Sequence, residues 1–222
     1  MKAARRFDLS PSDAIQLQKV LSPLIERVDR LGRNGVAGVR HIAGLDIAFA
    51  DQGRTTIAAA VLMRFPSLEL IGEVRIEQPT RFPYVPGLLS FRELPAGLVA
   101  IERLPVRPDL VLCDGQGYAH PRRFGLACHL GLALDLPSIG VAKSRLIGTA
   151  TEPGPERGDT AFLRHHDEII GMVLRTRRKV RPLYVSVGHR VSLETAVALT
   201  LQATTRYRLP EPLRRADQLS KT

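Results

Sequence analysis

The fold is decided by the stretch Asp109-Leu110-Val111-Leu112-Cys113-Asp114-Gly115-Gln116-Gly117. A short apolar run enclosed by turn residues is typical of a strand that is buried on both faces. The strand ends in a carboxylate, and open α/β sheets bind their ligands beyond the carboxyl ends of their strands. The two glycines allow backbone amides to approach a substrate closely. The stretch therefore predicts an α/β fold with a functional site at Asp114, although a solvated turn would use the same residue types.

The segments around this strand predict a mixed β-sheet flanked by helices. The three strands upstream are joined by short polar turns, which favour antiparallel hairpins. Downstream, a strand, a helix and a further strand follow one another at a spacing that implies a parallel pair with a right-handed crossover. We expect strands at residues 39–50, 55–65, 68–77, 109–113, 138–142, 161–164, 169–176 and 183–187, and helices at 96–104, 124–134 and 192–207.

The N-terminal part of the chain predicts a further, long helix. Ser10 supplies a hydroxyl cap, Pro11 lies in the first turn and an acid follows. Five apolar residues then recur at helical spacing and should face the core, with a kink at Pro23: Leu17, Leu21, Leu24, Val28 and Leu31. Residues 32–38 should form a flexible link. Because the chain has no internal repeat and no break in composition, we expect one domain over residues 1–222.

The composition indicates a folded protein with a polyanionic partner. Apolar residues make up 44% of the chain, and 32 basic residues against 22 acidic ones give a net charge of +10. Such a surplus favours nucleic acid first and an anionic membrane surface second. Cys113 and Cys128 resemble reduced core residues. The chain has neither a run of 18 apolar residues nor the apolar stretch of a signal peptide, so we expect no membrane span and a cytoplasmic location.

Four side chains are candidates for chemistry because each interrupts an apolar element near its edge: Asp46, Glu93, Asp114 and His189. If they converge at one edge of the sheet, they offer oxygen-rich ligands for Mg²⁺ or Mn²⁺. Other roles remain open for each, namely a carboxylate paired with arginine at Asp46, a surface residue at Glu93 and a cap at His189. We expect Pro95 to discourage a helix through Leu94. The histidine pair at residues 165–166 is better explained by a polar hairpin turn than by a metal cluster.

Two further segments could contact a nucleic acid. Prolines on both sides of Tyr84, with Gly87 close behind, predict a rigid loop that holds the aromatic ring outward as a wedge between stacked bases. Packing of the same ring on the core is the alternative. Lys143 follows the strand at 138–142 and should lie at the same edge as Asp114, where it can neutralise a scissile phosphate. An ordinary exposed charge would explain it equally well.

Taken together and in order, these motifs resemble the endonuclease V family, which acts on deaminated bases and on hypoxanthine above all. The resemblance extends over nearly all of residues 8–219. The matching motifs are Gly44-Leu45-Asp46, Pro83-Tyr84-Val85-Pro86-Gly87, Phe91-Arg92-Glu93, Asp114-Gly115-Gln116-Gly117 with His120-Pro121-Arg122, Gly140-Val141-Ala142-Lys143-Ser144, Ser186-Val187-Gly188-His189-Arg190 and Tyr207-Arg208-Leu209-Pro210-Glu211-Pro212.

The resemblance implies a ribonuclease H-like fold and a role for each candidate residue. Asp46, Glu93, Asp114 and His189 would form the metal site, with Lys143 near the cleaved phosphate. Tyr84 would be the wedge, and the pocket for an extruded base would be lined by Gly87, Leu89, Gly115, Gly117 and His120. The implied reaction is Mg²⁺-dependent hydrolysis, with Mn²⁺ as a substitute, of the second phosphodiester bond 3′ to deoxyinosine in DNA, leaving a 3′-hydroxyl and a 5′-phosphate.

Two alternatives to this function stay open. The chain could act mainly on inosine-containing RNA, because some family members prefer RNA and nothing in the residues decides the sugar. It could also bind deaminated bases without cutting, although the four acidic and histidine candidates argue against that. In either case we expect a monomer.

Overall fold

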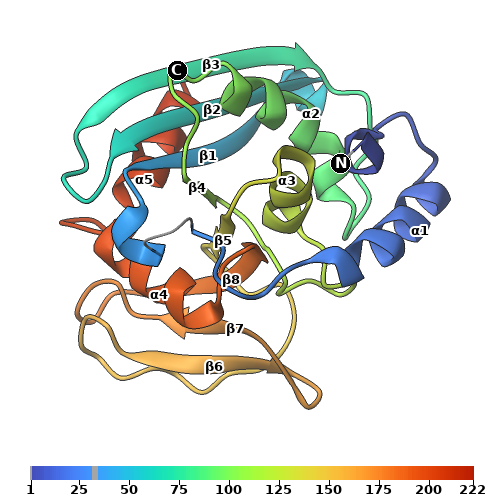
Figure 1. Ribbon diagram of the computed structural model, residues 1–222. Helices are drawn as coiled ribbons and strands as arrows, with labels where there is room; N and C mark the ends of the chain where they lie inside the picture. Colours follow the sequence, from blue (N-terminus) through green and yellow to red (C-terminus); the bar gives the residue numbers. More distant parts are fainter. Residues whose placement is uncertain (1, 32–34) are drawn as a thin grey trace.

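A mixed β-sheet runs through the molecule and carries helices on both faces (Figure 1). The computed structural model describes residues 2–31 and 35–222. Within these residues the sheet has eight strands in the order β3-β2-β1-β4-β5-β8-β7-β6. The strands are β1 (His41–Ala50), β2 (Thr55–Arg64), β3 (Leu70–Pro79), β4 (Leu110–Cys113), β5 (Ser138–Ala142), β6 (Thr160–His165), β7 (Glu168–Leu174) and β8 (Leu183–His189).

The pairing of the strands confirms the predicted mixed sheet. β1, β2 and β3 are antiparallel neighbours, whereas β1–β4 and β4–β5 are parallel pairs. β8, β7 and β6 extend the sheet beyond β5 in antiparallel fashion. The parallel pairs bring the carboxyl ends of β1, β4 and β5 to one edge of the sheet, and this edge carries Asp46, Asp114 and Lys143.

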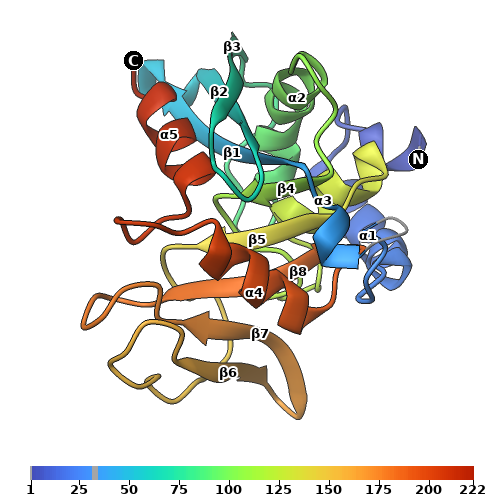
Figure 2. The same cartoon turned by 60° about the vertical axis from the view of Figure 1, so that its left-hand side comes forward.

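Two apolar layers enclose the sheet. The α-helices are α1 (Pro11–Leu21), α2 (Leu89–Glu102), α3 (Leu126–Leu134), α4 (Leu193–Gln202) and α5 (Glu211–Leu219). The short 3₁₀ helices are η1 (Lys2–Arg5), η2 (Ser22–Leu24), η3 (Gly35–Gly38) and η4 (Asp51–Gly53). α2 and α3 pack on one face, and α4 and α5 on the other (Figure 2). No helix of the described residues is long and apolar enough to cross a bilayer.

The N-terminal helix is shorter than predicted. Ser10 caps it as expected, with its hydroxyl accepting from the backbone N–H of Asp13, but the helix ends at Leu21. Pro23 cannot donate the next helical hydrogen bond, and a 3₁₀ turn follows. Beyond it the backbone binds the end of β8, through bonds from Arg190 N to Glu26 O and from Arg30 N to Arg190 O. Leu24 and Val28 are consequently exposed rather than core-facing. Of the predicted link, Gly32–Asn34 lie outside the described residues.

Three of the helices depart most from the prediction, whereas most strand ends and the start of α3 differ by only one or two residues. α2 begins at Leu89 and includes Glu93 and Pro95, so the proline does not prevent the helix. The cost of a proline inside a helix, about 3 kcal/mol, is outweighed because nine residues of α2 are buried, most of them apolar. α4 ends at Gln202, and α5 was not predicted, since its sequence is mostly polar and its few buried residues are Pro212, Leu213 and Ala216.

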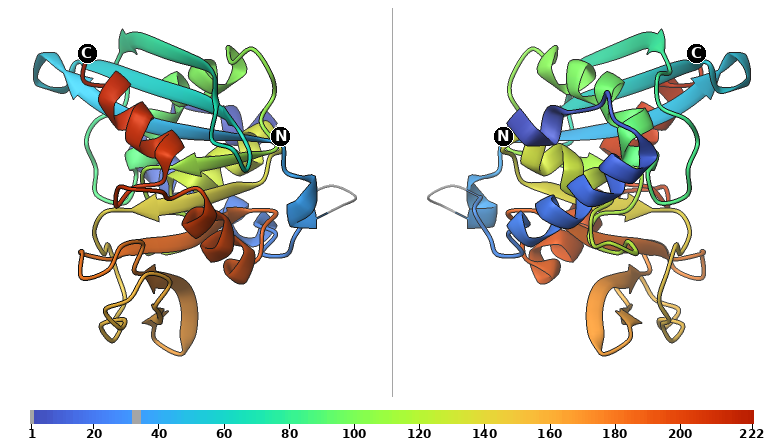
Figure 3. Two further views of the ribbon diagram at one scale, coloured as in Figure 1. Left: turned by 90° about the vertical axis from the view of Figure 1, so that its left-hand side faces the viewer. Right: turned by 90° about the vertical axis from the view of Figure 1, so that its right-hand side faces the viewer.

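A close backbone contact positions α5 across the sheet (Figure 3). A Cβ atom placed on Gly44 of β1 would lie 2.3 Å from the carbonyl carbon of Pro212 and 2.7 Å from the backbone nitrogen of Leu213. Only glycine permits this approach, because the obstructing atoms are backbone and cannot rotate away. The first turn of α5 is therefore held against the centre of β1.

We expect Gly44→Ala to displace α5 and to lower the free energy of unfolding by about 1–3 kcal/mol, the usual cost of overpacking. In a chain of this size each 1 kcal/mol lowers the unfolding temperature by about 2–4 °C. Thermal unfolding followed by circular dichroism measures the effect. An unchanged unfolding temperature would show that α5 is not held by this contact.

Candidate active site

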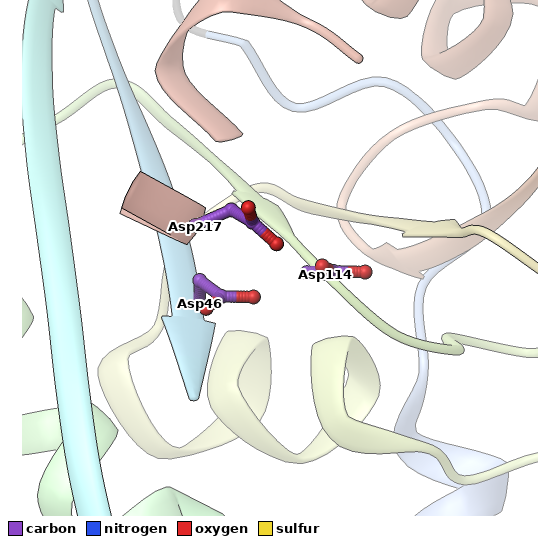
Figure 4. Close-up of side chains that lie close together, drawn as sticks. All are labelled: Asp46, Asp114 and Asp217. Carbon is purple, nitrogen blue, oxygen red and sulfur yellow. The ribbon is translucent and has the colours of Figure 1, made fainter. Parts of the chain in front are cut away.

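Three carboxylates from three separate elements meet at the carboxyl edge of the sheet (Figure 4). Asp46 belongs to β1, Asp114 directly follows β4, and Asp217 lies on α5. One oxygen from each lies within 4.8 Å of the others. The strand register explains why Asp46 and Asp114 are neighbours. β1 and β4 are parallel and Leu45 pairs with Cys113, so the next residue of each chain segment lies beside the other.

Burial and mutual repulsion make it unfavourable for all three carboxylates of this triad to be ionised at once. Desolvation of the buried Asp46 carboxylate, together with the adjacent Asp114, raises the pKa of Asp46 to about 6. The Ser220 hydroxyl partly offsets this by donating to Asp46 Oδ2 at 2.6 Å. Glu93 lies deeper, and burial followed by the charges of Asp46 and Asp114 raises its pKa to about 8. Glu93 does not belong to the triad, but the negative charges of Asp46 and Asp114 contribute to its raised pKa.

Lysine side chains offset part of this negative charge. Lys143 Nζ lies 2.5 Å from Asp114 Oδ2 and 2.7 Å from Asp217 Oδ1. Partial burial opposes the charge of Lys143, but its bonds to the two carboxylates outweigh burial and raise its pKa. Lys221 Nζ lies 2.6 Å from Asp217 Oδ2. Burial would raise the pKa of Asp217, yet these two lysines hold it below its usual value.

The donor set fits a divalent cation. Carboxylate oxygens from three directions are the ligands that Mg²⁺ and Mn²⁺ prefer. Burial first, and the neighbouring carboxylates second, raise the pKa values of Asp46 and Glu93. Asp46, Asp114 and Asp217 could therefore hold a metal ion, with Glu93 beside them.

A cavity of about 200 Å³ adjoins the triad: Asp114 belongs to both, and Glu93 also lines the cavity. Four of the five residues predicted to line a base pocket do line it: Gly87, Leu89, Gly115 and His120. Drug-sized ligands usually occupy about 300–1,000 Å³, so this smaller cavity suits a single flat ring system. Tyr84 is at the rim and is 71% exposed, which contradicts packing of its ring on the core.

Gly117 is the exception among the predicted pocket residues. It does not line the cavity but packs against β8, where a Cβ would lie 2.2 Å from Val187 O. Its backbone N–H donates to Ser186 Oγ at 2.9 Å. Gly117 therefore fixes the loop behind the pocket.

His120 lines the cavity as a neutral imidazole. Burial, reinforced by the Arg122 charge, lowers its pKa to about 4. The backbone N–H of Arg122 donates to Nδ1 at 3.2 Å, so the ring proton must be on Nε2, which lies 3.1 Å from Gly87 O. Both ring nitrogens of His120 thus bind protein groups.

His189 does not belong to the metal site, and this prediction was wrong. β8 runs antiparallel to β5, so His189 pairs with Ser138 at the amino end of β5, away from the edge that carries Asp114. Its Nδ1 accepts from the backbone N–H of Glu26 at 3.3 Å. Burial and the nearby Arg190 lower its pKa, and none of the triad carboxylates influences it.

Asp217 is the residue that the sequence reasoning missed. It lies next to the buried Ala216 in α5. The apolar residues of α5 are too few for the sequence pattern to predict this helix. The available signal was the spacing of Leu213, Ala216 and the buried Ser220, which places an acid beside the inward face of a short helix.

The carboxylate cluster on a ribonuclease H-like sheet, beside a cavity for one ring system, defines a class: the nucleases that hydrolyse phosphodiester bonds at an acidic site. The family model described as Endonuclease V matches residues 23–218. The chain therefore belongs to the Endonuclease V family.

Individual relatives are similar to this chain over most of its length. Endonuclease V of Alkalilimnicola ehrlichii is 58% identical over 181 residues, which are 82% of this chain and 80% of the relative. The crystal structure of Endonuclease V from Streptomyces avermitilis has a TM-score of 0.89 at 41% identity and covers 97% of this chain and 93% of its own. Endonuclease V of Ciona intestinalis, in complex with a 24mer DNA that contains an inosine followed by a ribo-adenosine, has a TM-score of 0.82 at 26% identity, with 95% of each chain covered.

The raised pKa values predict how stability varies with pH in the metal-free protein. Because Asp46 and Glu93 bind protons more tightly when folded than when unfolded, the contribution of these two groups to stability is fully present below about pH 4 and is lost as the pH rises through about 6 for Asp46 and about 8 for Glu93. A bound divalent cation requires the ionised carboxylates, so it should stabilise the protein more at pH 8 than at pH 5.

Urea unfolding at pH 5 and pH 8, with EDTA and with Mg²⁺, measures both effects. Glu93→Gln should reduce the dependence of stability on pH in EDTA, because it removes the carboxyl group whose pKa is raised more by folding. A slope that stays unchanged in this variant would show that Glu93 does not titrate as its surroundings predict.

Proposed function

We propose that the chain is a Mg²⁺-dependent DNA repair endonuclease that acts on deaminated bases, deoxyinosine above all. It hydrolyses the second phosphodiester bond on the 3′ side of the lesion and leaves a 3′-hydroxyl and a 5′-phosphate. The observation that carries the proposal is that Asp114 belongs both to the carboxylate triad and to a cavity of a size that suits one base, with Glu93 lining the cavity beside it. Recognition and cleavage thus take place side by side.

The metal would be held by Asp46, Asp114 and Asp217, with Glu93 close behind. When bound, Mg²⁺ supplies charge relief to the phosphate and a hydroxide at neutral pH, and Mn²⁺ can substitute for it. Ser220 orients Asp46 through its hydroxyl, and Lys221 orients Asp217. Lys143 is held at the same place by Asp114 and Asp217, where its ammonium group can neutralise the cleaved phosphate.

The base site would work by extrusion. Rotating a base out of the stack costs a few kcal/mol, and less when the base is poorly paired, so a deaminated base enters more readily. The exposed ring of Tyr84 at the rim can fill the gap that the base leaves. Backbone groups around Gly87 and Gly115 would read the ring edges.

The partner and the setting follow from charge and chemistry. The net charge of +10 provides a sequence-independent attraction to the DNA backbone. The Ciona intestinalis relative binds DNA that contains inosine. All residues assigned above come from one chain, so we propose that it acts as a single-domain monomer. Its two buried free cysteines are compatible with the reducing cytoplasm, where we place it.

Cleavage of end-labelled duplexes with a single deoxyinosine tests this function, beside matched inosine RNA, in Mg²⁺ and in EDTA. We expect a Mg²⁺-dependent nick at the second phosphodiester bond 3′ to the lesion in DNA. Cleavage of the RNA alone would contradict a role in DNA repair and indicate a role in RNA processing. Binding of both nucleic acids without cutting would leave a recognition protein and refute the proposed hydrolysis.

Asp217→Asn should lower the cleavage rate at least about a hundredfold, as loss of a metal ligand does, and leave the affinity for DNA largely intact. Asp46→Asn and Asp114→Asn should act in the same way. The matched control is Asp167→Asn, which changes an exposed acid in the turn between β6 and β7. If Asp217→Asn cuts at the wild-type rate, the triad is not the metal site.

Tyr84→Ala should reduce the ratio of kcat/KM for inosine-containing over undamaged duplex by about tenfold, comparable with the 1–3 kcal/mol of one base–aromatic contact. Phe162→Ala, which removes another exposed aromatic ring on β6, should leave the ratio unchanged. An unaltered ratio in Tyr84→Ala would mean that the ring takes no part in recognition.

A further inference from the structure

One carbonyl group at the rim of the base cavity is held by three donors. Gly87 O accepts from Arg122 Nη2 at 2.7 Å, from Gln18 Nε2 at 3.0 Å and from His120 Nε2 at 3.1 Å. A carbonyl oxygen has two lone pairs, so three converging donors leave it no freedom to turn. Gly87 also has a φ of +77°, and a Cβ on it would lie 2.6 Å from the same Arg122 nitrogen.

Gln18 is the least expected of these donors. It lies on α1 and is 0% exposed, although a buried amide is costly unless all its groups are bonded. Its Nε2 donates to Gly87 O and to Phe124 O, at 3.0 and 3.1 Å, and its Oε1 accepts from Arg122 Nε. The amide can point only one way, because its oxygen must face the guanidinium and its nitrogen the two carbonyls.

These bonds add a second link between two segments that His120 and Arg122 already join directly at Gly87 O. Gly87 belongs to the loop that carries Tyr84, and Phe124 to the segment that follows His120. Both residues line the cavity, whereas Gln18 does not. Gln18 therefore touches neither base nor metal, and it sets the separation of the two walls from behind.

We propose that Gln18 is a positioning residue for base recognition, and that it acts by clamping the Gly87 carbonyl to the Phe124 segment. The inference rests on the proposed function, because it concerns the same cavity. A fixed separation of the walls holds the backbone groups of the Tyr84 loop at one distance from an inserted ring. Without the clamp, the loop would also accept bases whose ring edges carry a different pattern of hydrogen-bond donors and acceptors.

The affinity for DNA tests the clamp without cleavage, in EDTA. Gln18→Met preserves the length of the side chain and removes its hydrogen bonds. We expect the preference for a deoxyinosine duplex over an undamaged one to fall about tenfold, or ~1.4 kcal/mol, the size of one buried hydrogen bond. The affinity for undamaged duplex should not change, because backbone contacts supply it.

The chain offers a matched control in Gln16, which is exposed on the same helix. Gln16→Met should keep the full preference. Gln18→Glu is the second variant, since it keeps the contact with Arg122 but cannot donate to Gly87 O, and it should lose the preference as well. Equal loss of affinity for both duplexes, or an unchanged ratio in Gln18→Met, would overturn the proposal and leave Gln18 a structural residue.

Amide hydrogen exchange separates failure of the clamp from failure of the proposed function. If the wild-type protein shows no preference for inosine, the proposed function is wrong, whatever Gln18 does. Exchange in residues 84–88 should still be at least about tenfold faster in Gln18→Met than in wild type or Gln16→Met, with residues 126–134 unaffected. Unchanged exchange in residues 84–88 would refute the clamp itself.

Discussion

Mutual repulsion among buried carboxylates is the constraint on which the rest of the structure depends. Asp46, Asp114 and Asp217 bring oxygens within 4.8 Å of one another, and Glu93 adds a fourth acid behind them. Such a cluster is stable only where protons, ammonium groups or a cation compensate it. The chain supplies Lys143, Lys221 and the Ser220 hydroxyl, and a divalent cation is the further compensation that we propose for this site.

Close backbone packing is the means by which the fold holds this cluster together. Gly44 lets the first turn of α5 rest on β1, and Gly117 lets the loop after Asp114 rest on β8. On the other side of the cavity, Gln18 and Arg122 hold the Tyr84 loop through the carbonyl of Gly87. Asp114 and the Tyr84 loop lie outside regular secondary structure, and Asp217 lies on a short helix, but each is held by such a close contact.

The parts of this site that the sequence predicts are those with short-range causes. β5 was predicted with its observed bounds, and Asp46 and Asp114 were identified because a charge that interrupts or ends an apolar strand is conspicuous. His189 was misplaced because its position depends on the antiparallel direction of β8, which a single strand pattern does not encode. Asp217 and Gln18 were missed because both act through partners far away in the chain.

The hydrogen bond between Ser220 and Asp46 joins residues 174 positions apart, and α5 follows the other described helices in the sequence. Contacts of such long range form late in folding, and chains emerge from the ribosome N-terminus first. The base cavity is built wholly from residues 84–146, so it precedes α5 in the order of synthesis. An incomplete chain would thus hold the residues of the cavity before Asp217, the third carboxylate, is added.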